Sequence, residues 1–186
     1  MKVVETEIPG VLVVEPVVHG DERGWFLEGW QQRRYAEAGI DAVFVQDNYS
    51  FSRHGVLRGM HLQHPHGQGK LVQVLEGEVF DVVVDVRRGS PTFGRWTGVI
   101  LSAGNRRQFW VPPGLAHGFL VTGECALFSY KCTGFYHPEC EFAVRWDDPD
   151  IGIDWPVVGP PQLSDKDREA PRLRDIPPER LPEYGE

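Results

Sequence analysis

The chain has 186 residues, of which 27 are acidic and 19 are basic, so its formal net charge at pH 7 is −8. This length suits one domain, and the negative charge argues against a protein that coats a nucleic acid polymer or an anionic membrane. No apolar run approaches the ~20 residues of a transmembrane helix, and no secretory signal is visible. Cys125, Cys132 and Cys140 form no CxxC pair, so we expect small buried thiols in a reducing, cytoplasmic compartment.

Short runs rich in Val, Phe, Trp and Ile, spread among 21 glycines and 15 prolines, predict an all-β protein. The predicted strands, in chain order, are Val11–Val14, Val43–Gln46, Leu71–Leu75, Glu78–Val86, Gly98–Leu101, Gln108–Val111, Gly118–Val121, Ala126–Tyr130 and Phe142–Trp146. Glu76-Gly77 has the pattern of a turn, and the strand after it has the pattern of burial on both faces. We expect a double-sheet jelly roll.

Two short segments predict helix. Gln31–Ala38 contains helix-forming residues and stops at Gly39, and a single turn at residues 164–167 has Ser164 as its N-cap. From about residue 159 the chain is rich in proline, and we expect irregular structure there, with a loosely packed polar tail over the last dozen residues. Because no repeat or linker divides residues 1–186, we expect one domain.

Two histidine-containing segments, 57–70 and 111–119, resemble the two motifs of cupins. In metal-binding cupins, a His-x-His pair and a following carboxylate join a histidine from a Pro-x-Gly-x-x-His sequence. Here His64-Pro65-His66 matches the first motif and Pro112–His117 matches the second. Lys70 stands in place of the carboxylate, and an ammonium there removes a ligand and repels the metal ion.

A cavity with histidine and lysine and without a metal favours proton transfer beside a carbonyl. An imidazole is a suitable general base, but a carbon acid beside a ketone lies roughly ten pKa units above imidazolium, a gap of over about 13 kcal/mol. A lysine ammonium can close part of that gap by holding the enolate oxygen, and a tyrosine can return the proton from the opposite face. Three histidines can still bind zinc, so a metal-dependent cupin stays an open alternative, and His64 and His66 are otherwise loop residues.

A series of further short stretches runs in order from about residue 20 to residue 167. They are Asp21–Glu28, Gln46–Ser50, Val56–His61, Lys70–Val72, Asp81–Arg87, Gly89–Gly94, Pro113–Phe119, Tyr130-Lys131, Trp155-Pro156 and Leu163–Asp167. This series resembles the dTDP-4-dehydrorhamnose 3,5-epimerase family. The resemblance implies a double-stranded β-helix, or cupin jelly-roll barrel, with short peripheral helices and no cofactor or metal. It also implies inversion of C3 and C5 in a dTDP-linked 4-keto-6-deoxyhexose, in dTDP-L-rhamnose synthesis.

The resemblance also implies roles for particular residues. His61 would be the general base, Asp167 would orient it and stabilise its cation, Lys70 would hold the enolate oxygen, and Tyr130 would be the opposing acid. The residues implied to contact substrate are Arg23, Phe26, Glu28, Gln46, Asp47, Asn48, Arg58, His117, Tyr136, Glu141 and Lys166. Asp81 sits in an apolar strand and needs a buried partner, for which His117 is one candidate.

The family typically supplies the segment from Arg23 to Glu28 to the neighbouring subunit, which implies a homodimer with shared sites. One pocket would then receive four cationic side chains, those of Arg23, Arg58, Lys70 and Lys166. This pocket would be locally positive although the net charge of the chain is negative. Two features depart from the family pattern: Leu62 replaces a common aromatic residue, and His64 and His66 make a loop unusually basic.

Three alternatives stay open at this stage. Relatives in antibiotic-sugar pathways invert C3 or C5 alone, and the sequence does not separate them from a double epimerase. A metal-dependent cupin enzyme is a second alternative. A non-catalytic sugar-binding cupin is a third, although binding alone needs neither an acid nor a base.

Overall fold

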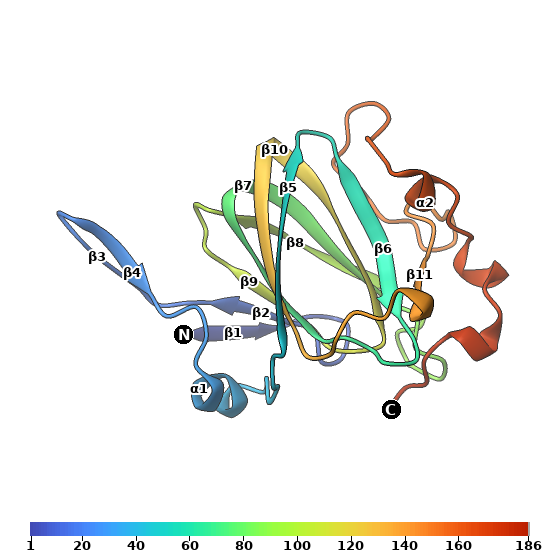
Figure 1. The fold of residues 1–186 in the computed structure, drawn as a ribbon, viewed down its shortest axis with the longest axis horizontal. Helices are drawn as coiled ribbons and strands as arrows, with labels where there is room; N and C mark the ends of the chain where they lie inside the picture. The colour runs from blue at the N-terminus through green and yellow to red at the C-terminus, as the bar shows by residue number, and fades with distance from the viewer. Residues whose placement is uncertain (186) are drawn as a thin grey trace.

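The computed structural model describes residues 1–185, and most of their regular secondary structure is strand (Figure 1). The strands are β1 (Lys2–Glu5), β2 (Leu12–Glu15), β3 (Val18–Asp21), β4 (Gly24–Leu27), β5 (Gln46–Arg53), β6 (Leu57–Gln63), β7 (Lys70–Asp85), β8 (Trp96–Ser102), β9 (Gln108–Val111), β10 (Leu115–Cys132) and β11 (Glu141–Ala143). The helices are α1 (Gln32–Glu37), α2 (Asp165–Arg168) and the 3-10 turns η1 (Pro138–Cys140), η2 (Leu173–Asp175) and η3 (Pro178–Arg180). The predicted all-β class with short helices is confirmed.

Two long strands, β7 and β10, shape the nine-stranded sheet into a jelly roll. The first part of β7 pairs with β9 and its last part with β8. In the same way, β10 pairs with β6 near its start and with β5 along its second part, and the two long strands pair with each other. Because each long strand belongs to both layers, the layers fold over one another and enclose a core. The predicted jelly roll is therefore confirmed.

β7 runs straight through Glu76-Gly77, so the turn predicted there is wrong. Gly77 has a φ of +78°, and a Cβ on it would lie 1.7 Å from the carbonyl oxygen of Cys125 on β10. At the same level, the ladder between β7 and β10 shifts register between Val121 and Ala126. Glycine permits both the positive φ and the close approach. The turn signal therefore marks a bulge inside one long strand.

The strand predicted at Val43–Gln46 is also wrong, because only Gln46 belongs to a strand. Val43 and Val45 are 67% and 42% exposed, so no sheet covers them. The last predicted strand is shorter than expected, since β11 ends at Ala143. Strands β1, β3, β4, β5 and β6 are absent from the predicted set. Polar residues and glycines interrupt the apolar pattern in most of these segments. They form strands because their backbones pair with neighbouring strands, and a local sequence pattern does not show that pairing.

Alternation along the strands divides the buried side chains between two cores. Val79 and Val83 of β7 pack in the core between the layers, together with Phe109. Val82 and Val84 of the same strand pack in a second core on the opposite face. Because successive side chains of a strand point to opposite faces, this strand is buried on both sides, as predicted.

The C-terminal segment covers the second core, so the predicted loosely packed tail is wrong. Leu173, Ile176 and Leu181 are 6%, 4% and 5% exposed and belong to that core. The backbone N–H of Leu173 donates to the buried carboxylate of Asp148 at 2.8 Å. A few apolar residues spaced along a polar, proline-rich segment are therefore enough to attach it to the barrel.

Both predicted helices are confirmed. Gln31 caps α1 by accepting a hydrogen bond from the backbone N–H of Arg34 at 2.6 Å, and Gly39 follows the helix with a φ of +96°. Ser164 Oγ caps α2 by accepting from the backbone N–H of Asp167 at 3.2 Å. This cap fixes the turn that carries Asp167.

Two further expectations concern the state of the cysteines and the absence of a transmembrane helix. Cys132 is buried as expected, whereas Cys125 and Cys140 are only partly buried, and all three are free thiols. Within residues 1–185, no helix is long and apolar enough to span a membrane.

Candidate active site

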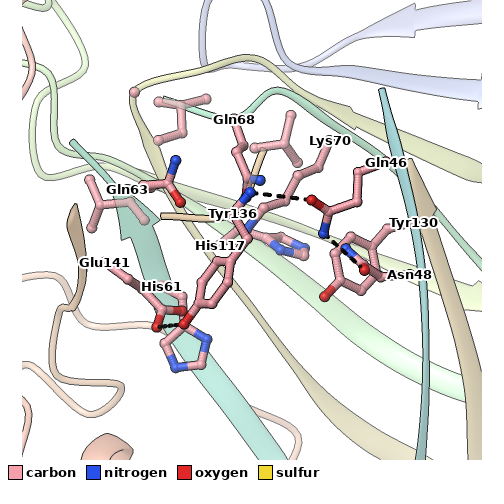
Figure 2. A pocket seen from close by; sticks show the side chains of 14 residues that line it. Gln46, Asn48, His61, Gln63, Gln68, Lys70, His117, Tyr130, Tyr136 and Glu141 are labelled. Carbon is pink, nitrogen blue, oxygen red and sulfur yellow. Dashed lines mark hydrogen bonds between the residues drawn. The ribbon is translucent and has the colours of Figure 1, made fainter. Parts of the chain in front are cut away.

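A polar cavity of about 340 Å³ opens at one end of the barrel (Figure 2). The ends of strands β5, β6, β7, β9, β10 and β11 meet there and supply most of its lining. The lining residues are Gln46, Asn48, His61, Leu62, Gln63, Gln68, Lys70, Val111, Gly114, Leu115, His117, Tyr130, Tyr136 and Glu141. Its size is in the range of small-molecule sites, and it brings together three of the predicted catalytic residues.

Strand alternation aims those three side chains into the cavity. On β6, Met60 packs in the second core, so His61 points to the opposite face. On β7, Lys70 begins the inward face that Val72 continues, and on β10 Tyr130 packs against the same inner core. Because β6 and the second part of β10 belong to opposite layers, His61 and Tyr130 lie on opposite sides of the cavity (Figure 2).

His61 forms a close pair with Asp167. His61 Nε2 lies 2.5 Å from Asp167 Oδ1, and the two side chains are 27% and 3% exposed. Burial raises the pKa of Asp167, but the hydrogen bond and charge of His61, with hydrogen bonds from Ser164 and Gly59, bring that pKa below its ordinary value. The ionised Asp167 accepts the Nε2–H, which leaves a lone pair on Nδ1 for a general base.

Lys70 and Tyr130 occupy desolvated positions. Burial lowers the pKa of Lys70, and the nearby Cys132, Glu141 and Asp81 offset part of that effect. Burial raises the pKa of Tyr130, and the proximity of Cys132 and Glu141 raises it further. Tyr130 therefore keeps its proton at neutral pH, as a general acid must, and a cation at Lys70 acts on an oxyanion with little screening by water.

His117 has its own carboxylate partner. His117 Nε2 lies 2.8 Å from Asp81 Oδ1, and the two side chains are 8% and 0% exposed. Burial raises the pKa of Asp81, with His117 and Lys70 opposing it. Within the described part of the chain, Asp81 Oδ2 has no hydrogen-bond partner. The structure thus identifies the partner of Asp81 that the sequence leaves open.

Glu141 organises the rim of the cavity. Its Oε2 accepts a hydrogen bond from the hydroxyl of Tyr136 at 2.9 Å and a second one from Lys166 Nζ. Burial raises the pKa of Glu141, but these two hydrogen bonds and the charge of Lys166 bring it below its ordinary value. Lys166 therefore reaches the cavity through Glu141 and is not itself part of the lining.

Two predicted substrate contacts lie far from the cavity of their own chain. Arg23 and Phe26 belong to the β3–β4 hairpin, which projects away from the barrel (Figure 1). Arg23 pairs with Asp21 at 2.5 Å, and Phe26 is 69% exposed. In one chain, the hairpin is therefore an exposed arm on which Phe26 is largely uncovered and Trp25 lies against the guanidinium of Arg106, 4.5 Å from its ring centroid.

Three further predicted contacts also lie outside the lining. Glu28 pairs with Arg34 at 2.7 Å, and Asp47 pairs with Lys131 at 3.0 Å on the outer face of the sheet. Arg58 is exposed, and its Nε donates to Ser52 Oγ at 3.0 Å. Of the four cations expected to converge, Lys70 alone lines the cavity within residues 1–185, so the expected convergence does not occur within one chain.

The histidines that match the first cupin motif lie outside the cavity. His64 and His66 border a separate groove that also contains Arg87 and Tyr184. They therefore do not join His117 in one ligand set. Among the residues that the structure describes, no group of three or more His, Cys, Asp or Glu side chains is placed to hold a metal ion.

Gln63 and Gln68 line the cavity but are absent from the predicted set. Gln63 is 5% exposed, and Gln68 Nε2 donates to the carbonyl oxygen of Gly134 at 2.8 Å. A glutamine at a strand end or in a loop has no distinctive sequence signal. Only the two-residue spacing from His61, which puts Gln63 on the same face of β6, indicates its position.

The chain is similar to known proteins over nearly its whole length. A family model described as dTDP-4-dehydrorhamnose 3,5-epimerase matches residues 5–175. The dTDP-4-dehydrorhamnose 3,5-epimerase of Pseudomonas aeruginosa is 53% identical over 176 residues, which cover 94% of this chain and 97% of that protein.

Solved structures agree with the sequence comparison. The dTDP-6-deoxy-D-glucose-3,5-epimerase of Legionella pneumophila, in complex with dTDP-4-keto-L-rhamnose, has a TM-score of 0.96 and 54% identity, covering 100% of this chain and 99% of that chain. A 3'-monoepimerase from Streptomyces bikiniensis, in complex with dTDP-quinovose, has a TM-score of 0.89 and 40% identity, covering 96% and 92%.

Proposed function

The chain belongs to the dTDP-4-dehydrorhamnose 3,5-epimerase family, and we propose that it inverts C3 and C5 of dTDP-4-keto-6-deoxy-D-glucose. It would act as an isomerase of dTDP-L-rhamnose synthesis, in a single cupin-type domain. One observation carries the proposal. A carboxylate-paired histidine and a protonated tyrosine face each other across a cavity, with a partly buried lysine beside them. The cytoplasmic location stays a prediction.

The proposed reaction consists of two proton exchanges beside one carbonyl. His61 takes the proton of C3 or C5 at Nδ1, the C–H electron pair forms a double bond to C4, and the carbonyl π pair moves onto the C4 oxygen. Lys70 stabilises the resulting enolate oxygen. Tyr130 then donates its proton to the opposite face of the same carbon, the ketone re-forms, and the centre is inverted. Exchange with solvent restores both groups before the second carbon reacts.

Asp167 supports the base in this scheme, and no metal takes part in the proposed steps. The carboxylate holds the imidazole in one orientation and stabilises the cation that forms when Nδ1 takes up a proton. His117, held by Asp81, lines the sugar pocket beside Lys70. These assignments give each of the buried charged groups of the cavity a part in the reaction.

The nucleotide end of the substrate is assigned to the rim. Gln46, Asn48, Tyr136 and Glu141 line that part of the cavity, which supports contact with thymidine and ribose through ring packing and hydrogen bonds. Lys166 lies just outside the lining and carries the charge that a diphosphate needs. Following the family resemblance, Arg58 of β6 and Asp47 of β5 are assigned to the same end of the substrate.

We also propose a homodimer in which each cavity receives the β3–β4 hairpin of the neighbouring subunit. Trp25 and Phe26 are 58% and 69% exposed on that hairpin, and exposed aromatic clusters of this kind are typical of interfaces. The outer face of β5 also carries exposed Tyr49 and Phe51. The hairpin would bring Arg23, Phe26 and Glu28 to the substrate of the partner.

A monofunctional epimerase is the second candidate, favoured by the likeness to the 3'-monoepimerase of Streptomyces bikiniensis. The same acid, base and oxyanion-stabilising group serve one inversion or two. The difference depends on whether the ring turns over in the cavity to present both carbons to His61.

Deuterium exchange tests the proposal and separates the candidates. The purified protein is incubated in D₂O with dTDP-4-keto-6-deoxy-D-glucose, and deuterium at C3 and C5 is measured by NMR. We expect exchange at both carbons together with the inverted product. Exchange at one carbon alone supports the monofunctional candidate, and no exchange contradicts both. Metal analysis of the same sample tests the metal-dependent class.

A matched pair of variants tests the assignment of the base. His61→Ala should abolish exchange at both carbons, because it removes the imidazole that is assigned to accept the proton, and it should leave dTDP binding largely intact. His54→Ala removes an exposed imidazole whose hydrogen bond in the described chain is to the carbonyl oxygen of Gly123, and this variant should exchange like wild type. Activity retained in His61→Ala would contradict the assignment.

A further inference from the structure

Two loops meet at the rim of the cavity and are bonded to each other. The first (residues 64–69) joins β6 to β7, and the second (residues 133–140) follows β10. The backbone N–H of Gly69 donates to Thr133 Oγ1 at 2.8 Å, and the N–H of Thr133 donates to the carbonyl oxygen of Gly69 at 2.9 Å. We call these segments the rim loops, and their bonds make them one unit.

The side chain of Gln63, at the end of β6, bonds to the backbone of both rim loops. Its buried amide oxygen accepts from the backbone N–H of His137 at 2.8 Å. Its amide nitrogen donates to the carbonyl oxygen of Phe135 at 3.2 Å and to that of His66. One side chain thus bonds the backbone on both sides of Tyr136, and every bonding partner that it satisfies lies in a rim loop.

Two histidine rings, one from each rim loop, also contact each other at this junction. His66 and His137 stack with their ring centroids 4.6 Å apart and their planes 28° from parallel. His137 Nδ1 also lies 3.2 Å from Glu139 Oε1. Neither histidine lines the cavity, and the proposed reaction uses neither of them. Their stacking adds a contact between the rim loops that the backbone bonds alone do not supply.

Tyr136 is the residue that this arrangement fixes. Its neighbours Phe135 and His137 are bonded to Gln63, and its own backbone N–H donates to Gln46 Oε1 at 3.2 Å. Its hydroxyl donates to Glu141 Oε2 (Figure 2). The bonds to Gln63 and Gln46 therefore hold three successive backbone positions, and the bond to Glu141 holds the end of the Tyr136 ring.

We propose that Gln63 and the stacked pair His66–His137 are positioning residues for the nucleotide end of the substrate, because they hold Tyr136 in place to pack against the base. This inference rests on the proposed function. A side chain fixed before binding loses less conformational entropy when the ligand arrives. The positioning residues should therefore affect nucleotide affinity and KM, whereas the proton transfers at His61 and Tyr130 should not change.

The test uses thymidine diphosphate binding by calorimetry and deuterium exchange at saturating substrate. His137→Ala removes the stack, and His137→Phe keeps an aromatic ring in its place. Loss of one aromatic contact predicts about three- to tenfold weaker binding for His137→Ala. The kcat for exchange should stay within about twofold of wild type, and His137→Phe should bind within about twofold of wild type. His66→Asn, which tolerates the φ of +68°, should behave like His137→Ala.

Gln63→Leu removes more bonds between the rim loops, but Gln63 is buried and its replacement can also destabilise the fold. The variants of the partly exposed His137 therefore provide the decisive test. Unchanged binding in His137→Ala, or a fall in kcat with unchanged binding, would overturn the proposal. Equal losses in His137→Phe and His137→Ala would overturn the role of the stack. Wild-type protein that binds no thymidine diphosphate would instead contradict the proposed function, so the two failures are distinguishable.

Discussion

At the scale of single residues, the cavity contains two histidine–carboxylate pairs with different surroundings. The pair of His61 and Asp167 is partly open to solvent, and the pair of His117 and Asp81 is nearly closed. In the first pair the pKa of the carboxyl group is lowered by its partner, and in the second it is raised by burial. Burial raises the pKa of both carboxyl groups, but the hydrogen bonds and charge around Asp167 outweigh it, whereas at Asp81 burial prevails.

Asp167→Asn should show a pH-dependent loss of stability. The folded-state pKa of Asp167 lies below its ordinary value of about 4, so its ionised form stabilises the fold above that pH. This stabilisation is lost as the pH falls through the lower folded value. We expect the Tm difference between wild type and Asp167→Asn to be large at pH 7 and to shrink below about pH 4. Thermal unfolding across this range measures it.

Asp165→Asn, on the same helical turn, provides the control. Asp165 is 89% exposed and pairs with the exposed Arg168, so its replacement should change Tm little at either pH. A Tm difference for Asp167→Asn that stays constant from pH 7 to pH 3 would contradict the assigned ionisation of Asp167.

At the scale of elements, the length of β7 and β10 decides the architecture. Each strand crosses from one layer to the other, and the bulge at Gly77 lets β7 bend where β10 changes register. The bend directs the first part of β7, with Lys70, toward the open end of the barrel. A change at Gly77 should therefore disturb the fold and the position of Lys70 together.

Gly77→Ala and Gly89→Ala form a matched pair. Both glycines have nearly the same φ, +78° and +79°, so both substitutions carry the cost of a left-handed residue, about 1–2 kcal/mol. A Cβ meets nothing within 4 Å at Gly89, but at Gly77 it meets the Cys125 carbonyl oxygen. We expect Gly77→Ala to cost about 1–3 kcal/mol more, measured by urea unfolding. Equal costs would contradict the bulge as a close-packed crossing.

At the scale of the whole molecule, the two ends of the chain behave in opposite ways. The C-terminal segment packs on its own barrel, and the N-terminal β3–β4 hairpin extends away from it (Figure 1). Apolar residues occur in both segments, but only the first finds a buried surface within its own chain. The first segment should therefore contribute to stability, and the second to association.

Leu181→Ala tests the role of the C-terminal segment. Leu181 is 5% exposed in the second core, and truncation of a buried leucine costs about 2–5 kcal/mol. Glu179→Ala, at an exposed position of η3, should stay within about 0.5 kcal/mol of wild type. Chemical unfolding of both variants measures the difference. Similar, small costs for the two variants would contradict the packing of this segment.

Mixed dimers test the shared site. A subunit with Arg23→Ala is co-expressed with a differently tagged subunit carrying His61→Ala, and the mixed dimer is purified. If the hairpin serves the neighbouring cavity, one site of the mixed dimer has both native residues, and about half of wild-type activity returns. If the hairpin serves its own cavity, no site is intact. Activity near that of the Arg23→Ala homodimer would contradict sharing.

The sequence by itself determined the strand-rich class and both short helices, and its family resemblance pointed to His61, Lys70, His117 and Tyr130 as members of one site. These follow from local patterns and from a series of motifs in order. Only the tertiary structure decided that β7 and β10 run unbroken, that the tail is packed, that Asp81 pairs with His117, and that Gln63 holds the rim loops. Each of these depends on contacts between residues far apart in the chain, for which local composition carries no signal. The negative net charge of the chain likewise describes its surface. The charge within the cavity depends instead on which side chains are buried there and how they are paired.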